Sequence, residues 1–248
     1  FNFVNFTGSV GGGQAIEKAA AGTFTPLGLE LGGKDPGYVR ADANLDAAVD
    51  TLMDGAMFNA GQCCCGIERI YVHEAVYDKY VEEFVREVKS YKIGQPTEDG
   101  VYIGAISRKN QIGFLENQVS DAISKGAKLQ TGGKAISQKG YFFEPTVFTD
   151  VNHKMSLMKD ESFGPIIGIM KVKNDAQAIK LMQDTEYGLT ASVYSSNQKR
   201  AEKILKQIDS GTGYWNCCDR VSANLPWSGR KNSGFGATLS HIGIRAFV

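Results

Sequence analysis

The stretch Phe58-Asn59-Ala60-Gly61-Gln62-Cys63-Cys64-Cys65-Gly66 joins a run with helical periodicity to the apolar, strand-like Ile70-Tyr71-Val72. Three consecutive thiols therefore lie at a helix-to-strand junction. Only a thiolate is an effective nucleophile, and a free thiol with a pKa near ~8.5 needs backbone N–H groups, a helix dipole or a cation to ionise at neutral pH. Two interpretations stay open at this point, a reactive nucleophile or a buried cluster of small apolar cysteines.

A second stretch, Leu29-Glu30-Leu31-Gly32-Gly33-Lys34-Asp35-Pro36, carries one glutamate between two leucines at the entry to a Gly-Gly turn. Burial raises the pKa of a carboxyl group toward neutrality and makes it a usable general base. The alternative is a glutamate at a strand end that simply reaches solvent.

The N-terminal residues combine a strand-like run with glycines. Phe3-Val4-Asn5-Phe6 leads into a Gly-rich loop over 7–16 and a helical run over 17–21. Glycines allow the backbone to approach a phosphate, and the N-terminus of the following helix offers free N–H groups to it. The order of the glycines differs from the G-x-G-x-x-G fingerprint of dinucleotide-binding proteins, so an ordinary turn is the alternative.

The rest of the chain alternates helical and apolar segments. Helical spacing of apolar residues occurs over 45–56, 76–88, 112–123, 178–182 and 201–208, and strand-like runs occupy 142–148 and 165–172. Asp42 or Asn44 is expected to cap the first of these helices. Residues 91–100 and 132–140 are expected to be loops, the second a surface hairpin. This alternation predicts an α/β fold with a largely parallel sheet.

Composition excludes several classes of protein. The 248 residues include 27 Lys+Arg and 27 Asp+Glu, and this balance gives no support for a nucleic-acid or anionic-membrane partner. No apolar run approaches the ~20 residues of a membrane span, and the first residues lack the basic region of a signal peptide. Five cysteines in adjacent runs make a poor disulfide framework and lack the spacing of a zinc site, so we expect no metal and a reducing, cytoplasm-like compartment.

Together, the glutamate and cysteine stretches resemble the signatures of the NAD(P)-dependent aldehyde dehydrogenase superfamily. The family's Gly-Gln-x-Cys pattern selects Cys64 as the reactive cysteine, with Glu30 standing 34 residues before it as the base that activates water. The resemblance implies an aldehyde dehydrogenase-like catalytic domain with a mostly parallel sheet, attached to part of a Rossmann-like cofactor domain.

The resemblance also implies a cofactor site for NAD or NADP, with NAD favoured. Glu161-Ser162-Phe163-Gly164-Pro165 is similar to the family's Glu-x-Phe-Gly-Pro motif, whose glutamate binds the nicotinamide ribose and whose phenylalanine packs near the ring. A carboxylate that accepts two hydroxyl hydrogen bonds suits a ribose. The other residues implied in cofactor binding are Gly8, Ser9, Gly13 and Leu31.

For the aldehyde, the resemblance implies a pocket near the nucleophile. Its candidate residues are Cys63, Cys65, Trp215, Val221 and Trp227. Where many relatives carry an acidic residue after the Ser-Gly, this chain has Ala237-Thr238, so an acidic proton relay is not expected there.

The resemblance covers essentially the whole chain, although the family's chains are roughly twice as long. We therefore expect a C-terminal portion of such an enzyme, with a remnant of the NAD-binding domain over 1–31, a catalytic domain over 32–232 and a return segment over 233–248. Expressed alone, the chain is expected to bind NAD poorly, because upstream strands and an oxyanion-binding asparagine are absent. A homodimer or homotetramer is expected at full length.

The function implied is oxidation of a small-molecule aldehyde to a carboxylic acid by NAD(P)+, through a thioester on Cys64 that Glu30-activated water hydrolyses. One alternative is a CoA-acylating aldehyde dehydrogenase, which the presence of Glu30 disfavours. A second is a non-catalytic fragment that acts only in assembly. A third, a cysteine hydrolase, would have to use His73, His153 or His241, none of which lies in a suitable context.

Overall fold

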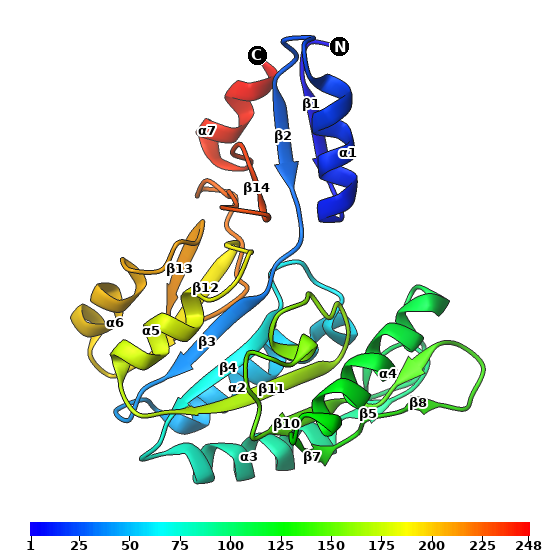
Figure 1. Ribbon diagram of the computed structural model, residues 1–248, viewed down its shortest axis with the longest axis vertical. Coiled ribbons are helices and arrows are strands. Elements are labelled where there is room, and N and C mark those ends of the chain that lie inside the picture. The colour runs from blue at the N-terminus through cyan, green and yellow to red at the C-terminus, as the bar shows by residue number, and fades with distance from the viewer.

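The computed structural model describes all residues, 1–248, and divides into a small and a large lobe (Figure 1). The small lobe is a three-stranded sheet with two helices, formed by both ends of the chain. Its elements are β1 (Val4–Thr7), α1 (Val10–Ala20), β2 (Leu27–Glu30), β14 (Gly234–Phe235) and α7 (Ser240–Ile244), followed by the short 3₁₀ helix η3 (Arg245–Phe247). β2 lies in the middle, parallel to β1 and antiparallel to β14.

The large lobe is organised around a seven-stranded sheet. In spatial order its strands are β13 (Thr212–Trp215), β12 (Thr190–Tyr194), β3 (Asp35–Val39), β4 (Ile67–His73), β11 (Ile166–Val172), β10 (Thr146–Thr149) and β7 (Lys128–Thr131). Every neighbouring pair is parallel except the edge pair of β10 and β7. The central strands are buried along their length, as expected for a parallel sheet that is covered on both faces.

Helices cover this sheet, and most begin at a side-chain cap. They are α2 (Leu45–Met57), α3 (Tyr77–Ser90), α4 (Lys109–Ser124), α5 (Asp175–Gln183) and α6 (Gln198–Leu205). Asn44, Asn174 and Asn197 each accept a hydrogen bond from a backbone N–H in the first turn of α2, α5 and α6, which satisfies a donor that the helix leaves free. α2 packs against α3 and β4, and α6 packs against β12 and β13.

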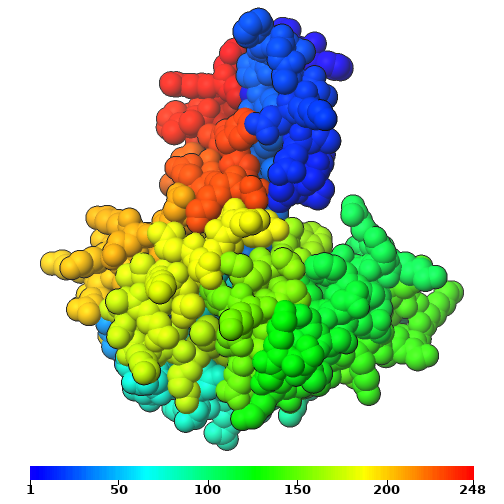
Figure 2. Space-filling view, viewed as in Figure 1, coloured from blue at the N-terminus to red at the C-terminus, as the bar shows by residue number.

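Shorter elements complete the lobe. They are the 3₁₀ helices η1 (Phe58–Gly61) and η2 (Ser156–Met158), the parallel pair β5 (Lys92–Ile93) and β6 (Val101–Ile103), and the antiparallel pair β8 (Ala135–Ile136) and β9 (Phe142–Phe143). In the space-filling view the small lobe stands on the larger one, and residues near 230 fill the junction (Figure 2). No helix has both the length and the apolar character needed to cross a membrane.

The α/β class and the mostly parallel sheet are confirmed, as are the helices expected from apolar periodicity and the hairpin around residues 132–140. Two expectations were wrong. Residues 91–100 contain the strand β5. This strand depends on pairing with β6, which local sequence propensity does not reveal. The Gly-rich segment is not a loop, because α1 already begins at Val10: Ser9 caps it by accepting a hydrogen bond from the Gly12 N–H at 3.2 Å.

Candidate active site

Three segments that are distant in sequence meet between the lobes. We call them the link (residues 31–35, which joins β2 to β3), the cysteine loop (58–66) and the acidic loop (160–165). A Cβ atom on Gly33 would lie 2.2 Å from the Cys64 carbonyl oxygen, and one on Gly32 would lie 2.2 Å from Glu161 Oε2. A side chain at position 33 would clash with the Cys64 backbone, so this position requires glycine, and at Gly32 the Glu161 side chain packs directly against the link.

The cysteine loop has an unusual backbone that its own contacts stabilise. Asn59, Ala60 and Gly61 have φ values of 53°, 55° and 70°. Left-handed conformations at non-glycine residues cost about 1–3 kcal/mol each and persist where surrounding contacts fix them. The Gln62 side chain supplies such contacts: it donates to the Asn59 and Ala105 carbonyls and accepts from the Ser107 N–H at 2.8 Å. The glutamine of the Gly-Gln-x-Cys pattern therefore stabilises the conformation of the loop.

The three thiols of the loop interact with one another. All are free, Cys65 is buried, and the Cys63 and Cys65 sulfurs lie 3.5 Å apart. Hydrogen bonds with the Cys64 and Cys65 thiols lower the pKa of Cys63 to about 3. The hydrogen bond with Cys63 and burial in turn raise the pKa of Cys64 to about 11, and the same causes raise the pKa of Cys65. The three thiols thus titrate as a coupled unit, in which ionisation of one thiol opposes ionisation of its neighbours.

Glu30 ends β2 and lies at the junction of the lobes. Its carboxylate is half-buried and accepts hydrogen bonds from the hydroxyls of Thr238, through Oε1, and of Thr7, through Oε2 at 3.4 Å. It also lines a small cavity with Trp227. No hydrogen bond joins Glu30 to a cysteine. Trp227, which lines the same cavity as Glu30, also packs against Cys65.

The acidic loop presents a carboxylate and an aromatic ring. Glu161 Oε1 accepts a hydrogen bond from the Gly33 N–H at 3.0 Å. Burial, assisted by the charge of Glu68, raises the pKa of Glu161 to about 7. Phe163 has φ 45° and its ring stays 38% exposed. An acceptor group and an exposed ring thus lie two residues apart beside the cysteine loop.

The glycines and the serine near the N-terminus have packing roles in the structure. The missing side chain of Gly13 leaves room for Leu31, since a Cβ there would lie 2.6 Å from Leu31 Cδ1. Gly8 packs in the same way against the ring of Phe6. Ser9 is the N-cap of α1, so the N-terminus of this helix, with its free N–H groups, lies just after β1 and Gly8.

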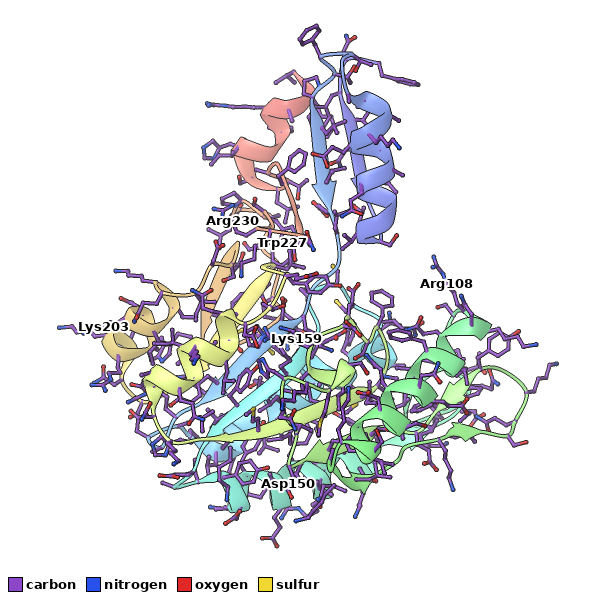
Figure 3. The ribbon with its side chains drawn as sticks, viewed as in Figure 1. Arg108, Asp150, Lys159, Lys203, Trp227 and Arg230 are labelled. Atoms are coloured by element: carbon purple, nitrogen blue, oxygen red, sulfur yellow. The ribbon has the colours of Figure 1, made fainter.

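The predicted pocket residues separate into two groups. Trp227 is buried and packs with Cys65 and Leu189, while Cys63 and Cys64 pack against this cluster. Figure 3 shows Trp227 at the junction of the lobes. Trp215 and Val221 are exposed, and the Trp215 indole donates to the Ser195 carbonyl at 2.8 Å. Of the predicted pocket residues, Trp227 and the two flanking cysteines therefore belong to the cluster against which Cys64 packs, while Trp215 and Val221 do not.

Sequence reasoning missed three polar side chains next to the predicted site. Thr238 bonds to Glu30, Asp35 bonds to Thr190, and Glu68 bonds to Lys34 and the acidic loop. Burial raises the pKa of Asp35 to about 8. The only sequence signal for Glu68 is a charged Glu68-Arg69 pair at the start of an apolar strand.

The residues present fit the nicotinamide end of NAD. Glu161 keeps Oε2 without a hydrogen bond from the protein and so has capacity for a ribose hydroxyl, and the exposed ring of Phe163 offers a packing surface. No group of three or more His, Cys, Asp or Glu side chains is placed to hold a metal ion.

Comparisons with known proteins agree with this fold. The model of the aldehyde dehydrogenase family matches residues 1–248. Aldehyde dehydrogenase 1A1 of Bos taurus is 39% identical over 99% of this chain and 49% of its own length. The chain belongs to the aldehyde dehydrogenase family, and it spans about half the length of the curated relatives it matches.

Solved structures give the same result. An NAD-dependent aldehyde dehydrogenase from Sinorhizobium meliloti superposes with a TM-score of 0.96 at 36% identity, covering 99% of this chain and 49% of that one. Betaine aldehyde dehydrogenase from Staphylococcus aureus in complex with NAD+ superposes with a TM-score of 0.94 at 33% identity, covering 98% and 49%.

Proposed function

We propose that the protein containing this chain oxidises an aldehyde to a carboxylic acid with NAD+, using Cys64 as the nucleophile. The observation that carries the proposal is the meeting of the cysteine loop and the acidic loop at Gly32 and Gly33, which sets a thiol cluster beside a carboxylate suited to a ribose. Membership of the family and the similarity to NAD-dependent enzymes support the choice of reaction.

In this proposal, Cys64 attacks the aldehyde carbonyl as a thiolate. The three thiols titrate as a coupled unit, and the proposal places the negative charge of the reacting cluster on Cys64, the sulfur that the Gly-Gln-x-Cys pattern selects. Trp227 and Cys65 form an apolar surface beside it. Cys63 and Cys65 are thus pocket groups rather than nucleophiles, and Trp215 and Val221 remain proposed contacts for the rest of the aldehyde.

Cofactor binding is assigned to both lobes. Glu161 accepts ribose hydroxyls and Phe163 packs near the nicotinamide, while Gly8, Ser9, Gly13 and Leu31 shape the end of β1 and α1 near the pyrophosphate. The chemistry that bound NAD+ supplies is acceptance of a hydride from the substrate carbon. NAD is favoured over NADP because the similar solved structures include an NAD-dependent enzyme and an NAD+ complex.

Release of the product is assigned to Glu30. Its carboxylate, oriented by Thr238 and Thr7, takes a proton from the water that attacks the thioester on Cys64. This role favours hydrolysis over transfer to CoA. We propose that residues 1–31 and 233–248 belong to the cofactor side and residues 32–232 to the catalytic side, and that the full-length protein is a cytoplasmic homo-oligomer.

The test is turnover by the longest reading frame that contains this chain. Purified protein is incubated with NAD+ or NADP+ and a panel of aliphatic, aromatic and amino aldehydes, and NADH formation and carboxylic acid release are both measured. Equal amounts of the two products with at least one aldehyde are expected. Acid release that requires added CoA would support the acylating alternative, and saturating aldehyde with no NADH would contradict the proposal.

A further inference from the structure

Glu68 is a buried carboxylate to which the predicted mechanism gives no role. It lies at the start of β4, four residues after Cys64, and is 5% exposed. Its two oxygens accept hydrogen bonds from the Ser162 N–H at 2.7 and 3.1 Å and from the Phe163 N–H at 3.0 Å. A side chain of the strand that follows the nucleophile therefore holds two successive amides of the acidic loop.

Lys34 completes this arrangement from the link. Its ammonium group lies 2.6 Å from Glu68 Oε2 and 3.0 Å from Ser162 Oγ, and its side chain has no exposure. The carboxylate is thus paired, as a buried charge must be, and the pair connects the link to the acidic loop. The neighbouring Gly33 amide binds Glu161.

The hydrogen bonds of Glu68 fall where the acidic loop is strained. Phe163 is held in the left-handed region at φ 45°, a conformation that phenylalanine adopts only when its surroundings fix it. The Glu68 carboxylate binds the amide of this residue and of the one before it. In the loop conformation that Glu68 stabilises, Phe163 is partly exposed and the Glu161 carboxylate is hydrogen-bonded to the Gly33 N–H.

We propose that Glu68 is a positioning residue for the cofactor: it fixes Ser162 and Phe163 so that Glu161 and the Phe163 ring are preorganised to receive the nicotinamide riboside. This inference rests on the proposed function of the acidic loop. Preorganisation lowers the entropic cost of ordering the loop when the cofactor binds. Its loss should therefore weaken the affinity for NAD more than the affinity for the aldehyde.

The experiment compares Glu68→Gln with Glu74→Gln in the longest reading frame that contains this chain. Glu74 is an exposed glutamate just beyond the other end of β4 and is the matched control. Because Glu68→Gln leaves Lys34 as a buried unpaired charge, the double variant Lys34→Met/Glu68→Gln is measured as well. Removing both charges of a buried pair preserves folding better than removing one.

Three readouts are taken: Kd for NAD by calorimetry, the separate KM values for NAD and aldehyde with kcat, and hydrogen exchange of the Ser162 and Phe163 amides. In Glu68→Gln and in the double variant we expect about a tenfold higher Kd and KM for NAD, the effect of losing a hydrogen bond to a charged group. KM for the aldehyde is expected to change less than twofold, the two amides to exchange faster, and Glu74→Gln to match the wild type.

An unchanged affinity for NAD in both Glu68 variants, or equal increases in the KM values for NAD and aldehyde, would overturn the inference and leave Glu68 a structural ion pair. Wild-type protein that binds NAD without forming NADH would contradict the proposed oxidation alone, and the Kd values would still decide the role of Glu68. Wild-type protein that binds no NAD would contradict both.

Discussion

The hydroxyl of Thr238 donates a hydrogen bond to the carboxylate of Glu30 across 208 positions of sequence. Thr238 is itself fixed by a two-way backbone pairing with Trp227, at N···O distances of 2.9 and 2.8 Å. Trp227 in turn packs against Cys65. Glu30, the proposed base, is thus connected to the thiol cluster through the short C-terminal segment 227–238. The orientation of Glu30 depends on this segment.

Replacing Glu30 with Gln is expected to separate the two halves of the reaction. Acylation of Cys64 precedes the need for a base, so the burst of NADH should remain, while steady turnover should fall about 10²-fold because water is no longer activated. Stopped-flow measurement of NADH gives both phases. Equal loss of burst and steady state would place Glu30 in thiol activation or in structure instead.

Thr238→Val removes the hydroxyl that orients Glu30 while keeping the shape of the side chain. The steady rate is expected to fall about tenfold, in line with the loss of a hydrogen bond to a charged group, and the burst to persist. Thr7→Val is the matched control, because the Thr7 hydroxyl lies 3.4 Å from the other oxygen of Glu30 and its loss should matter less. A larger effect at Thr7 would assign the orienting role to β1.

Substitution of each cysteine in turn tests the choice of nucleophile. Cys64→Ser is expected to abolish aldehyde oxidation, because a serine hydroxyl is not ionised at neutral pH. Cys63→Ser and Cys65→Ser should retain most activity, since a hydroxyl still donates a hydrogen bond to a Cys64 thiolate. Initial rates decide this, together with mass spectrometry of protein treated with a thiol reagent in the presence of aldehyde. An inactive Cys63→Ser with an active Cys64→Ser would move the nucleophile to Cys63.

Much of the candidate site could be proposed from the sequence because its main groups lie in short contiguous motifs. Glu30, Cys64, Glu161 and Phe163 were each proposed in this way, and they remain predictions. The fold class followed from the alternation of helices and strands and from the buried apolar runs of β4 and β11.

The contacts that connect these motifs could not be predicted, because they depend on three-dimensional proximity between unrelated positions. Nothing in the sequence pairs Thr238 with Glu30 or Glu68 with the amides of the acidic loop. The helical state of the Gly-rich segment was missed for a different reason: glycine disfavours helix, but the Ser9 cap and the packing of Gly13 against Leu31 outweigh that preference.

The affinity for NAD is expected to rise with pH through neutrality because of Glu161. Burial and the charge of Glu68 raise its pKa to about 7, against the opposing effects of the Gly33 amide and Lys34. Below that pH the carboxyl group is protonated, and only the ionised form accepts two ribose hydroxyls. Affinity should therefore increase by at most about tenfold per pH unit between pH 6 and 7 and level off above pH 8.

Calorimetric titration with NAD over this pH range provides the measurement. In Glu161→Gln the affinity should be lower and nearly independent of pH. A pH dependence that survives unchanged in this variant would assign the titration to another group near the cofactor.

Asp35, at the end of the link, is expected to make folding stability depend on pH. It is fully buried, and its oxygens accept hydrogen bonds from the Thr190 N–H at 3.0 Å and the Thr190 hydroxyl at 2.6 Å. Burial raises its pKa from 3.8 to about 8. The folded state thus binds the proton more tightly than the unfolded state, so this group destabilises the fold as pH rises from about 4 to about 8 and adds no further change above that.

Asp35→Asn mimics the protonated carboxyl group, because its carbonyl accepts from the Thr190 N–H and its amide donates to the Thr190 hydroxyl. Urea unfolding at pH 6 and pH 8 should therefore show the wild type losing stability relative to the variant, by at most about 1.4 kcal/mol per pH unit. The comparison between the two proteins cancels the titration of groups that they share. A difference in unfolding free energy that stays constant over this range would mean that Asp35 is already ionised in the folded protein, with Thr190 and nearby cations offsetting its burial.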